Sequence, residues 1–431
     1  MEQLMMSIEQ RGAFFYAYIF QRFGIIAAQA RAGFAVNRNH DGWASCNADE
    51  VFAAALKAAK EALESADKTY RDINALALSV ERGAALVWDA KTGVPVCDLA
   101  LPDCSRARSL CRDLSNKEGF GYKVRECCGT VIDHRFSAPK LAWILENVPD
   151  ARQCAERGEL LFGSMDSWLI WNFTGGKTHA CDCSNAAYTM LYDIYKRQWD
   201  ADLLTALKIP EQMLPDVKLS SADFGETISE YFGGPVKIAC AAGNENNALF
   251  GQTCYDLGKA RVSYGSTCDV IVHTGLSPVI STSNIMTTFA YGIAGINKYA
   301  LHAPHWLDMC TDDESNLAAC EKMAYRVYKI VRLAEKDTGC PVQMLHADGD
   351  AAYGADSDAL LQLQADLLQI PVCRPAVKEV SALGSVYIAG VFTGFFKGRD
   401  DVVPYWKAEK IFDPAVSPPE RDALVERLAK A

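Results

Sequence analysis

An alternation of short apolar runs with amphipathic segments constrains the fold of this chain more than any other feature. Asn47 and Glu50 stand three residues apart, as the two ends of a helix capping box do, and an apolar stripe follows them from residue 51 to residue 63. Continuous apolar runs at 13–20, 73–80 and 236–242 are typical of buried strands. Such an alternation predicts an α/β protein built in layers.

The second half of the chain continues the pattern. It predicts a hairpin of two strands, a long helix, a further strand and two more helices, with a domain boundary near residues 241–246. The expected ranges are 262–264 and 269–273 for the hairpin, 315–336 for the long helix, 342–346 for the strand, and 358–368 and 381–396 for the last helices.

Composition excludes several classes of function. A net charge of −11 provides no electrostatic footprint for nucleic acid. The apolar run at 13–20 is too short to span a bilayer, and two glutamates and no basic segment precede it, so neither a membrane span nor a signal peptide is expected. Sixteen cysteines show no zinc-ligand spacing, which indicates reduced thiols and a cytoplasmic protein.

Two blocks of sequence carry a specific resemblance. Residues 159–219 and residues 374–398 are similar to the FGGY family of carbohydrate kinases, and within it to the glycerol kinases. The first block matches through Gly163, Asp166, Trp168, Leu169, Thr174, Gly175, Ser184, Asn185, Met190, Leu191, Trp199 and Pro210.

The resemblance implies two actin-like (ribonuclease-H-like) ATPase domains, at 1–242 and 243–431. It also implies that the second domain is shortened by a deletion near 304–314. Substrate and ATP would meet between the domains, and Mg²⁺ would accompany the nucleotide.

Positions that serve catalysis in the family differ here. The family's catalytic aspartate corresponds to Asn244, and an amide has no useful basicity near neutral pH. Glu245, one residue along, is a possible substitute. The family's metal-binding aspartate corresponds to Glu9, and the hydroxyl-bearing phosphate loop that follows it has become Ala13-Phe14-Phe15, which is expected to disable that loop.

The polyol pocket keeps one of four family positions. Arg82 matches, while Gly83, Pro102 and Arg135 replace a glutamate, a tryptophan and a tyrosine. One interpretation makes Arg82 a surviving ion-pair residue. The alternative is that Arg82, Arg135 and Arg106 line a pocket for an anionic ligand.

The nucleotide side combines matches and changes. Gly265, Ser266 and Thr267 correspond to the family's phosphate hairpin, and Gly349 corresponds to a glycine that lies against adenosine. The deletion removes a segment that helps to close the nucleotide cleft. Trp306 lies at the site of this deletion, and a protein partner or a second copy of the chain is expected to dock there.

The substitutions predict a glycerol-kinase-like protein that is catalytically inactive and serves as a structural or interaction subunit. The first alternative is an active ATP-dependent phosphotransferase that converts glycerol, or a related polyol, to its phosphate. The second is a nucleotide or sugar sensor without turnover.

Overall fold

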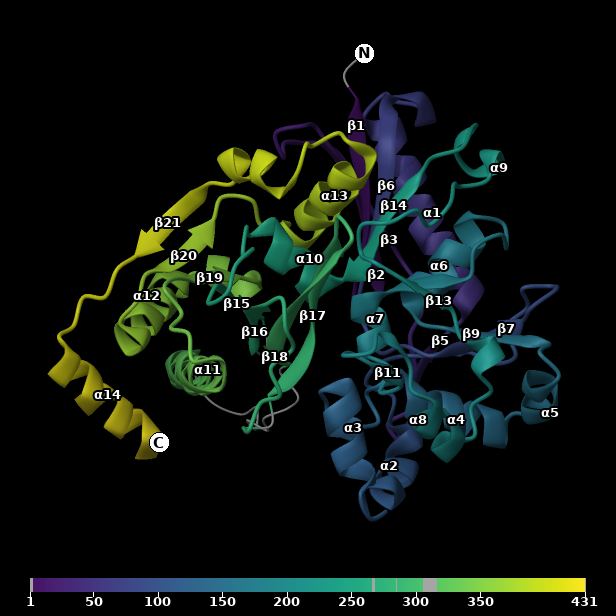
Figure 1. Ribbon diagram of the computed structural model, residues 1–431. Helices are drawn as coiled ribbons and strands as arrows, with labels where there is room; N and C mark the ends of the chain where they lie inside the picture. The colour runs from purple at the N-terminus through teal and green to yellow at the C-terminus, as the bar shows by residue number, and fades with distance from the viewer. Residues whose placement is uncertain (1–2, 266–267, 284, 305–315, 431) are drawn as a thin grey trace. The chain divides into compact units, whose positions relative to one another are not determined.

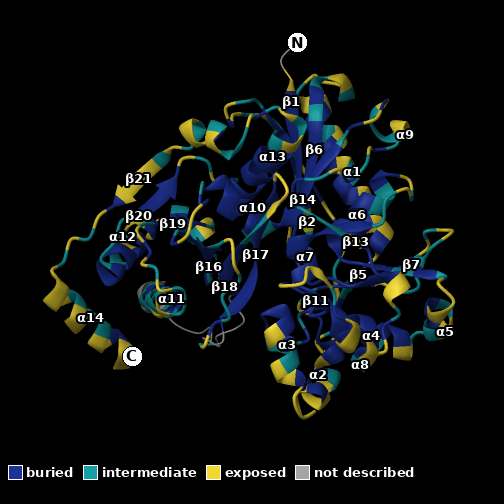
Figure 2. Cartoon of the chain, viewed as in Figure 1, coloured by how far each residue is buried: buried dark blue, intermediate teal, exposed yellow. Residues whose placement is uncertain are grey.

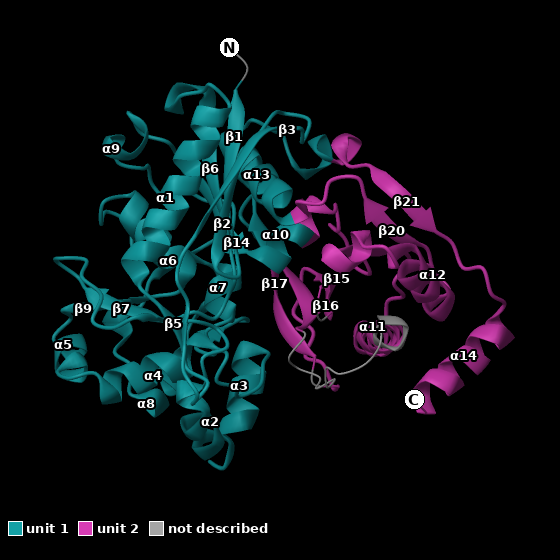
Figure 3. Ribbon diagram, turned by 180° about the vertical axis from the view of Figure 1, so that it is seen from behind, with its two compact units in different colours: residues 1–248, 291–297, 381–402 teal, residues 249–290, 298–380, 403–431 magenta. Residues whose placement is uncertain are grey.

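The computed structural model describes residues 3–265, 268–283, 285–304 and 316–430 (Figure 1). The chain forms two compact units, each made of three separate segments of sequence and shown in different colours in Figure 3. Unit 1 contains residues 1–248, 291–297 and 381–402, and unit 2 contains residues 249–290, 298–380 and 403–431. The compact units therefore do not follow the successive segments 1–242 and 243–431, and that division by family domains stays a prediction.

Unit 1 is built on a five-stranded sheet. Three antiparallel strands, β3, β2 and β1, are followed by two strands that run parallel to β1, in the order β14-β6-β1-β2-β3. The bounds are β1 Leu4–Arg11, β2 Phe14–Phe20, β3 Ile26–Gly33, β6 Ile73–Val80 and β14 Ile238–Gly243.

Helices cover both faces of this sheet, so its central strands are buried (Figure 2). On one face α1 (Ala48–Ser65) packs on β2 and β3 through alanines, whose small side chains allow a close approach. On the other face α13 (Val380–Thr393) is joined to β1 and β6 by hydroxyl pairs, Ser7 with Ser385 at 2.8 Å and Ser79 with Ser381 at 2.7 Å. Burial on both faces explains why the central strands are mainly apolar.

Short elements complete unit 1 around the main sheet. Its further strands are β4 Asn37–Arg38, β5 Ala44–Cys46, β7 Leu86–Asp89, β8 Leu99–Ala100, β9 Leu160–Gly163, β10 Ala180–Asp182, β11 Tyr192–Asp193, β12 Gln198–Trp199 and β13 Asp216–Lys218. Its further helices are α2 Arg108–Ser115, α3 Phe120–Cys128, α4 Ser137–Asn147, α5 Ala151–Glu156, α6 Met165–Phe173, α7 Cys183–Ala187, α8 Ala201–Leu207 and α9 Ser229–Phe232. Helix α10, Asn244–Gly251, begins in unit 1 and ends in unit 2.

Unit 2 repeats the same strand pattern in a larger sheet. Antiparallel β18, β16 and β15 are followed by β19 and β20, which run parallel to β15, and by antiparallel β21, with β17 beyond β18. The bounds are β15 Ala260–Tyr264, β16 Cys268–Gly275, β17 Met286–Ile293, β18 Ile296–Ala303, β19 Leu345–Asp348, β20 Val372–Pro375 and β21 Ala408–Phe412.

Helices α11 (Asn316–Thr338), α12 (Ser357–Leu368) and α14 (Pro418–Lys430) pack on one another and contribute to the core of unit 2. Among the described residues, no helix is both long and apolar enough to cross a membrane.

Most elements predicted from the sequence are present. The aromatic run forms β2, the run at 73–80 forms β6, and the hairpin and the long helix appear as β15–β16 and α11. The strand predicted at 342–346 begins instead at Leu345. The helix predicted at 381–396 ends at Thr393, because Gly394 takes a left-handed φ of 74°.

Candidate active site

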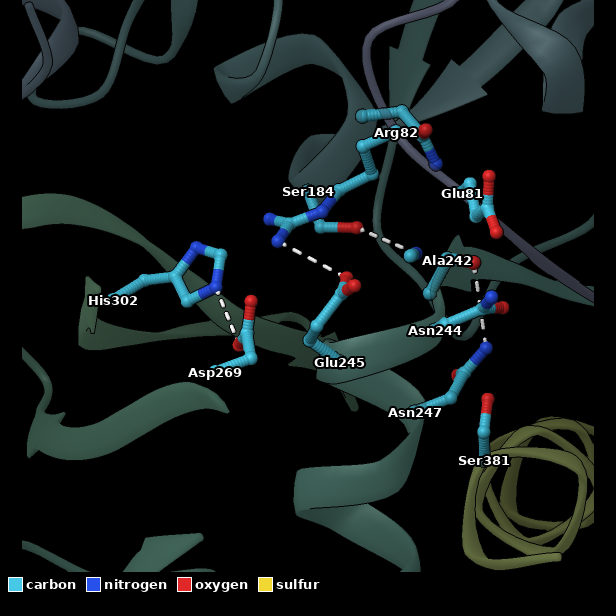
Figure 4. A network of polar contacts seen from close by, with 12 residues as sticks. Glu81, Arg82, Ser184, Ala242, Asn244, Glu245, Asn247, Asp269, His302 and Ser381 are labelled. Carbon is cyan, nitrogen blue, oxygen red and sulfur yellow. Dashed lines mark hydrogen bonds and ion pairs between the residues drawn. The ribbon is translucent and has the colours of Figure 1, made fainter. Parts of the chain in front are cut away.

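The parallel strands of unit 1 end side by side and bring four polar residues together. Gly243 at the end of β14 pairs with Val80 at the end of β6. Glu81 and Arg82 follow β6, and Asn244 and Glu245 follow β14 (Figure 4). The carboxyl ends of parallel strands are where α/β proteins place their ligands.

Arg82 and Glu245 form an ion pair at this edge, and Figure 4 shows their side chains pointing toward one another. Arg82 Nη2 lies 3.1 Å from Glu245 Oε2; the guanidinium side chain is 2% exposed and the carboxylate side chain 25% exposed. The arginine packs on Gly243, where an added Cβ would lie 2.5 Å from Arg82 Cδ, and its Cζ lies 4.4 Å from the centre of the Tyr188 ring. A buried cation therefore holds a partly exposed carboxylate in place.

Asn244 is engaged at both ends of its amide. Its Nδ2 donates to the carbonyl oxygen of Gln10 at 2.7 Å, and its Oδ1 accepts a hydrogen bond from Ser79 Oγ at 2.8 Å. A carboxylate at this position would lack the donor toward Gln10. The amide thus joins the ends of β1, β6 and β14, and it offers no base.

The turn between β1 and β2 is closed by a carboxylate of the chain itself. The amide nitrogen of Gly12, which has a φ of 55°, donates to Glu81 Oε1 at 2.7 Å. Gln10 completes the contact, because its Oε1 accepts from the Glu81 amide at 2.8 Å and its Nε2 donates to the Gly12 carbonyl at 2.8 Å. Burial raises the pKa of the Glu81 carboxyl above its ordinary value, and the hydrogen bonds from Gly12 and Gln10 oppose that rise.

The side chains of Phe14 and Phe15, which follow Gly12, point away from this turn. Phe15 is buried in the sheet core, and the ring of Phe14, which is 41% exposed, packs on Gly33 with the Arg31 guanidinium 5.5 Å from its centre. The sequence predicted that these side chains disable the turn by crowding it. The structure instead shows the turn amide bonded to Glu81.

Glu9, the predicted Mg²⁺ ligand, is buried at the end of β1. Its Oε2 lies 3.5 Å from Nε of Arg11, whose guanidinium also donates to Tyr18 Oη at 2.6 Å. A carboxylate is the kind of ligand Mg²⁺ prefers, and the Arg11 side chain beside it is partly exposed, with its Cζ 4.1 Å from the centre of the Tyr16 ring. The residue therefore fits a cation-binding role.

Gly83 and Arg135, two of the positions predicted to line the polyol pocket, lie against one another. This glycine has a φ of 95°, and a Cβ added to it would lie 2.5 Å from the carbonyl oxygen of Arg135. The backbone of residue 135 thus occupies the space where a side chain at residue 83 would begin. Lys140 holds this segment from inside, donating to the carbonyls of His134 at 2.7 Å and Phe136 at 2.8 Å, and burial lowers its pKa to about 7.

The anionic pocket of three arginines has no support in the structure. Arg82 pairs with Glu245, Arg135 Nη1 lies 3.2 Å from Asp133 Oδ1, and Arg106 lies against two tryptophan rings. Each guanidinium has a partner of its own, so their charges do not combine in one site.

Two predicted nucleotide-binding residues lie at neighbouring strand ends in unit 2. Gly265 follows β15 and Gly349 follows β19, and these strands are parallel neighbours. A Cβ at Gly349 would lie 2.3 Å from the Tyr264 carbonyl oxygen, so only glycine fits there. Ser266 and Thr267, like Trp306, lie outside the described residues, and their roles stay predictions.

Several polar contacts were missed by the sequence reasoning. Glu81 was not among the predicted site residues. Its position next to Arg82, directly after a predicted strand, is the signal that could have identified it. In unit 2, His302 Nε2 lies 2.8 Å from Asp269 Oδ1, and the imidazole is buried (Figure 4). No spacing in the sequence indicates that pair, because its members are 33 residues apart.

Comparison with known proteins defines the class. Residues 4–251 match the N-terminal domain of the FGGY family of carbohydrate kinases, and residues 312–392 match its C-terminal domain. The chain belongs to this family and has its two-domain fold.

Within the family the chain is glycerol-kinase-like. It is 34% identical over 491 residues to the glycerol kinase of Thermoanaerobacter pseudethanolicus, with 100% of this chain and 98% of that protein covered. It is 33% identical over 487 residues to glycerol kinase 2 of Thermotoga maritima, with 99% and 97% covered. Both alignments are longer than the 431 residues of this chain, so they leave gaps in it.

Solved structures agree on the fold. Plasmodium falciparum glycerol kinase with ADP superposes with a TM-score of 0.91 at 21% identity, covering 100% of this chain and 97% of that one. A xylulose kinase from Rhodospirillum rubrum superposes with a TM-score of 0.84 at 16% identity, covering 100% and 98%. At under 25% identity these structures bear on the fold alone. The curated relatives, which are named glycerol kinases, give no support to an inactive subunit of a complex.

Proposed function

We propose that the protein is an ATP-dependent phosphotransferase that acts on glycerol or a related polyol. The observation that carries this proposal is the Arg82–Glu245 pair at the strand ends of unit 1. The family and the name of the curated relatives, glycerol kinase, support it. A cytoplasmic location stays a prediction from the sequence.

In this proposal Glu245 is the base. Its carboxylate is partly exposed and is oriented by a buried guanidinium, so it can accept the proton of a polyol hydroxyl as that hydroxyl attacks the terminal phosphate of the nucleotide. Arg82 holds Glu245 in this orientation. Glu9 would hold the Mg²⁺ that neutralises the phosphates, and the resemblance assigns Gly265 and Gly349 to the nucleotide.

The Arg82–Glu245 pair also sets the expected rate. The guanidinium engages Glu245 Oε2, so a polyol hydroxyl has to share this carboxylate with Arg82, and Glu245 stands one residue away from the position of the family's catalytic aspartate. General-base assistance is worth about 10²–10⁴-fold in rate, so we expect turnover below that of a kinase with an aspartate at position 244.

A second candidate function is binding without turnover, as a sensor or a structural subunit. It is favoured by Asn244, whose amide is engaged at both ends and cannot accept a proton. Under this candidate the Arg82–Glu245 pair binds a polyol and no phosphate moves.

A coupled assay of glycerol-dependent ATP consumption, together with calorimetric binding of glycerol, separates the two. We expect saturable turnover in the wild type, reduced at least about 10²-fold by Glu245→Gln. Turnover should be unchanged by Glu64→Gln, an exposed matched control on α1. Glycerol binding without turnover would establish the second candidate, and the absence of both would overturn both.

A further inference from the structure

Three elements of unit 1 meet away from the strand ends and bring metal-ligating atoms together. Cys127 lies at the end of α3, Asp193 lies in β11 of the β11–β12 hairpin, and Asp200 is the N-cap residue of α8 (Figure 1). One ligand atom from each lies within 4.8 Å of the other two, and all three residues are buried. The spacing of the cysteines could not indicate this cluster, because it joins distant parts of the sequence.

Backbone hydrogen bonds fix the cluster. The amide of Ile194 donates to the Cys127 carbonyl at 2.8 Å, which ties the hairpin to α3, and the Asp200 amide donates to the Leu191 carbonyl at 2.9 Å. Asp193 Oδ1 accepts from two turn amides, and Asp200 Oδ1 accepts from the Leu203 amide at 3.0 Å. One oxygen of each carboxylate is thereby committed, and its orientation is set.

The second oxygens face two lysines that reach in from the surface. Lys123 Nζ lies 3.0 Å from Asp200 Oδ2 and 2.7 Å from Asp202 Oδ2, and Lys196 Nζ lies 3.2 Å from Asp193 Oδ2. Both lysine side chains are partly or largely exposed. They can turn out to solvent, and Lys123 then keeps Asp202, which is exposed, as its partner.

We propose that Cys127, Asp193 and Asp200 form a binding site for a divalent transition metal of the zinc class. Thiolate and carboxylate ligands together suit Zn²⁺ and Co²⁺, whereas Mg²⁺ and Ca²⁺ take oxygen ligands alone. On binding, the Cys127 thiol releases its proton to solvent and a metal–sulfur bond forms. Asp193 and Asp200 each supply one oxygen, and water takes the fourth position.

The bound metal would fasten the β11–β12 hairpin and the start of α8 to α3. This is a structural role, and it does not depend on the proposed kinase activity. Because the metal replaces the lysine ammonium groups at the carboxylates, removing the charge of Lys123 should strengthen binding.

Cobalt titration of the full chain tests the site. We expect one equivalent of Co²⁺ to produce a near-ultraviolet thiolate-to-cobalt absorption band that Zn²⁺ abolishes by competition. Cys127→Ser, which keeps the shape of the side chain, should remove the band. Cys154→Ser, a matched control at a partly buried thiol on α5, should leave it, and Lys123→Gln should raise the apparent affinity several-fold.

Thermal unfolding gives a second measurement. Zn²⁺ should raise the melting temperature of the wild type and of Cys154→Ser but not of Cys127→Ser. A wild type that shows no thiolate band, or a band that survives in Cys127→Ser, would overturn the proposal and leave the cluster as a lysine–aspartate network.

Discussion

Glu81 already uses the one hydrogen bond that the Gly12 amide can donate. That amide lies in the turn after β1, to which the resemblance assigns phosphate binding. An incoming phosphate would meet a carboxylate of the same charge. Glu81 therefore opposes nucleotide binding in the proposed function, and more so at a pH at which it is ionised.

Replacement of Glu81 tests this opposition. Glu81→Gln keeps an oxygen for the Gly12 amide and removes the negative charge, so we expect ADP–Mg²⁺ to bind about fivefold tighter, as the loss of about 1 kcal/mol of repulsion gives. Calorimetry measures the change, with Glu64→Gln as the control. An unchanged affinity would mean that the phosphates bind away from this turn.

At the scale of elements, α1 shows how a local signal becomes structure. Asn47 Oδ1 accepts hydrogen bonds from the amides of Asp49 at 2.9 Å and Glu50 at 3.0 Å, which satisfies two donors of the first turn. The buried face of the helix then follows from its alanine-rich stripe. Cap and stripe are both local, so both could be predicted.

Removal of the cap has an expected cost. Asn47→Ala should lower the free energy of unfolding by about 1 kcal/mol, because two amides lose their acceptor. Urea denaturation measures the loss. Asn47→Ser, which restores an acceptor, should regain most of it, and equal losses in both variants would contradict the capping explanation.

The sequence predicted elements better than their assembly. Strands β2 and β6 could be predicted because burial on both faces leaves a continuous apolar run. The grouping of residues 381–402 with unit 1 could not, because it depends on contacts such as Ser79 with Ser381, 302 residues apart. Arg82 and Glu245 were identified by resemblance, whereas the contact of Glu81 with Gly12 requires the fold.

At the scale of the whole molecule, a buried carboxyl pair sets a pH dependence of stability. Asp166 and Asp182 are both buried, and the amide of Asp182 donates to Asp166 Oδ2 at 3.2 Å. Burial, with the nearby Asp182 carboxylate, raises the pKa of Asp166 from 3.8 to about 7. The folded protein thus keeps a proton that the unfolded chain releases, and stability should fall as the pH rises through this interval.

Asp166→Asn isolates that dependence. Asparagine has nearly the size of aspartic acid and does not ionise, so the variant should lose a slope of up to about 1.4 kcal/mol per pH unit. Urea denaturation of both proteins between pH 5 and pH 7 measures it. If the free energy of unfolding changed with pH equally in the wild type and in Asp166→Asn, Asp166 would be ionised in the folded state and the explanation would be wrong.

The close contact at Gly83 restricts which residues this position can accept. Any side chain restored at residue 83 would meet the carbonyl of Arg135 at 2.5 Å, and Lys140 anchors that segment from within the core. A glutamate at residue 83, which the resemblance gives to the family, would therefore require the backbone of residue 135 to move, and Lys140 opposes that movement.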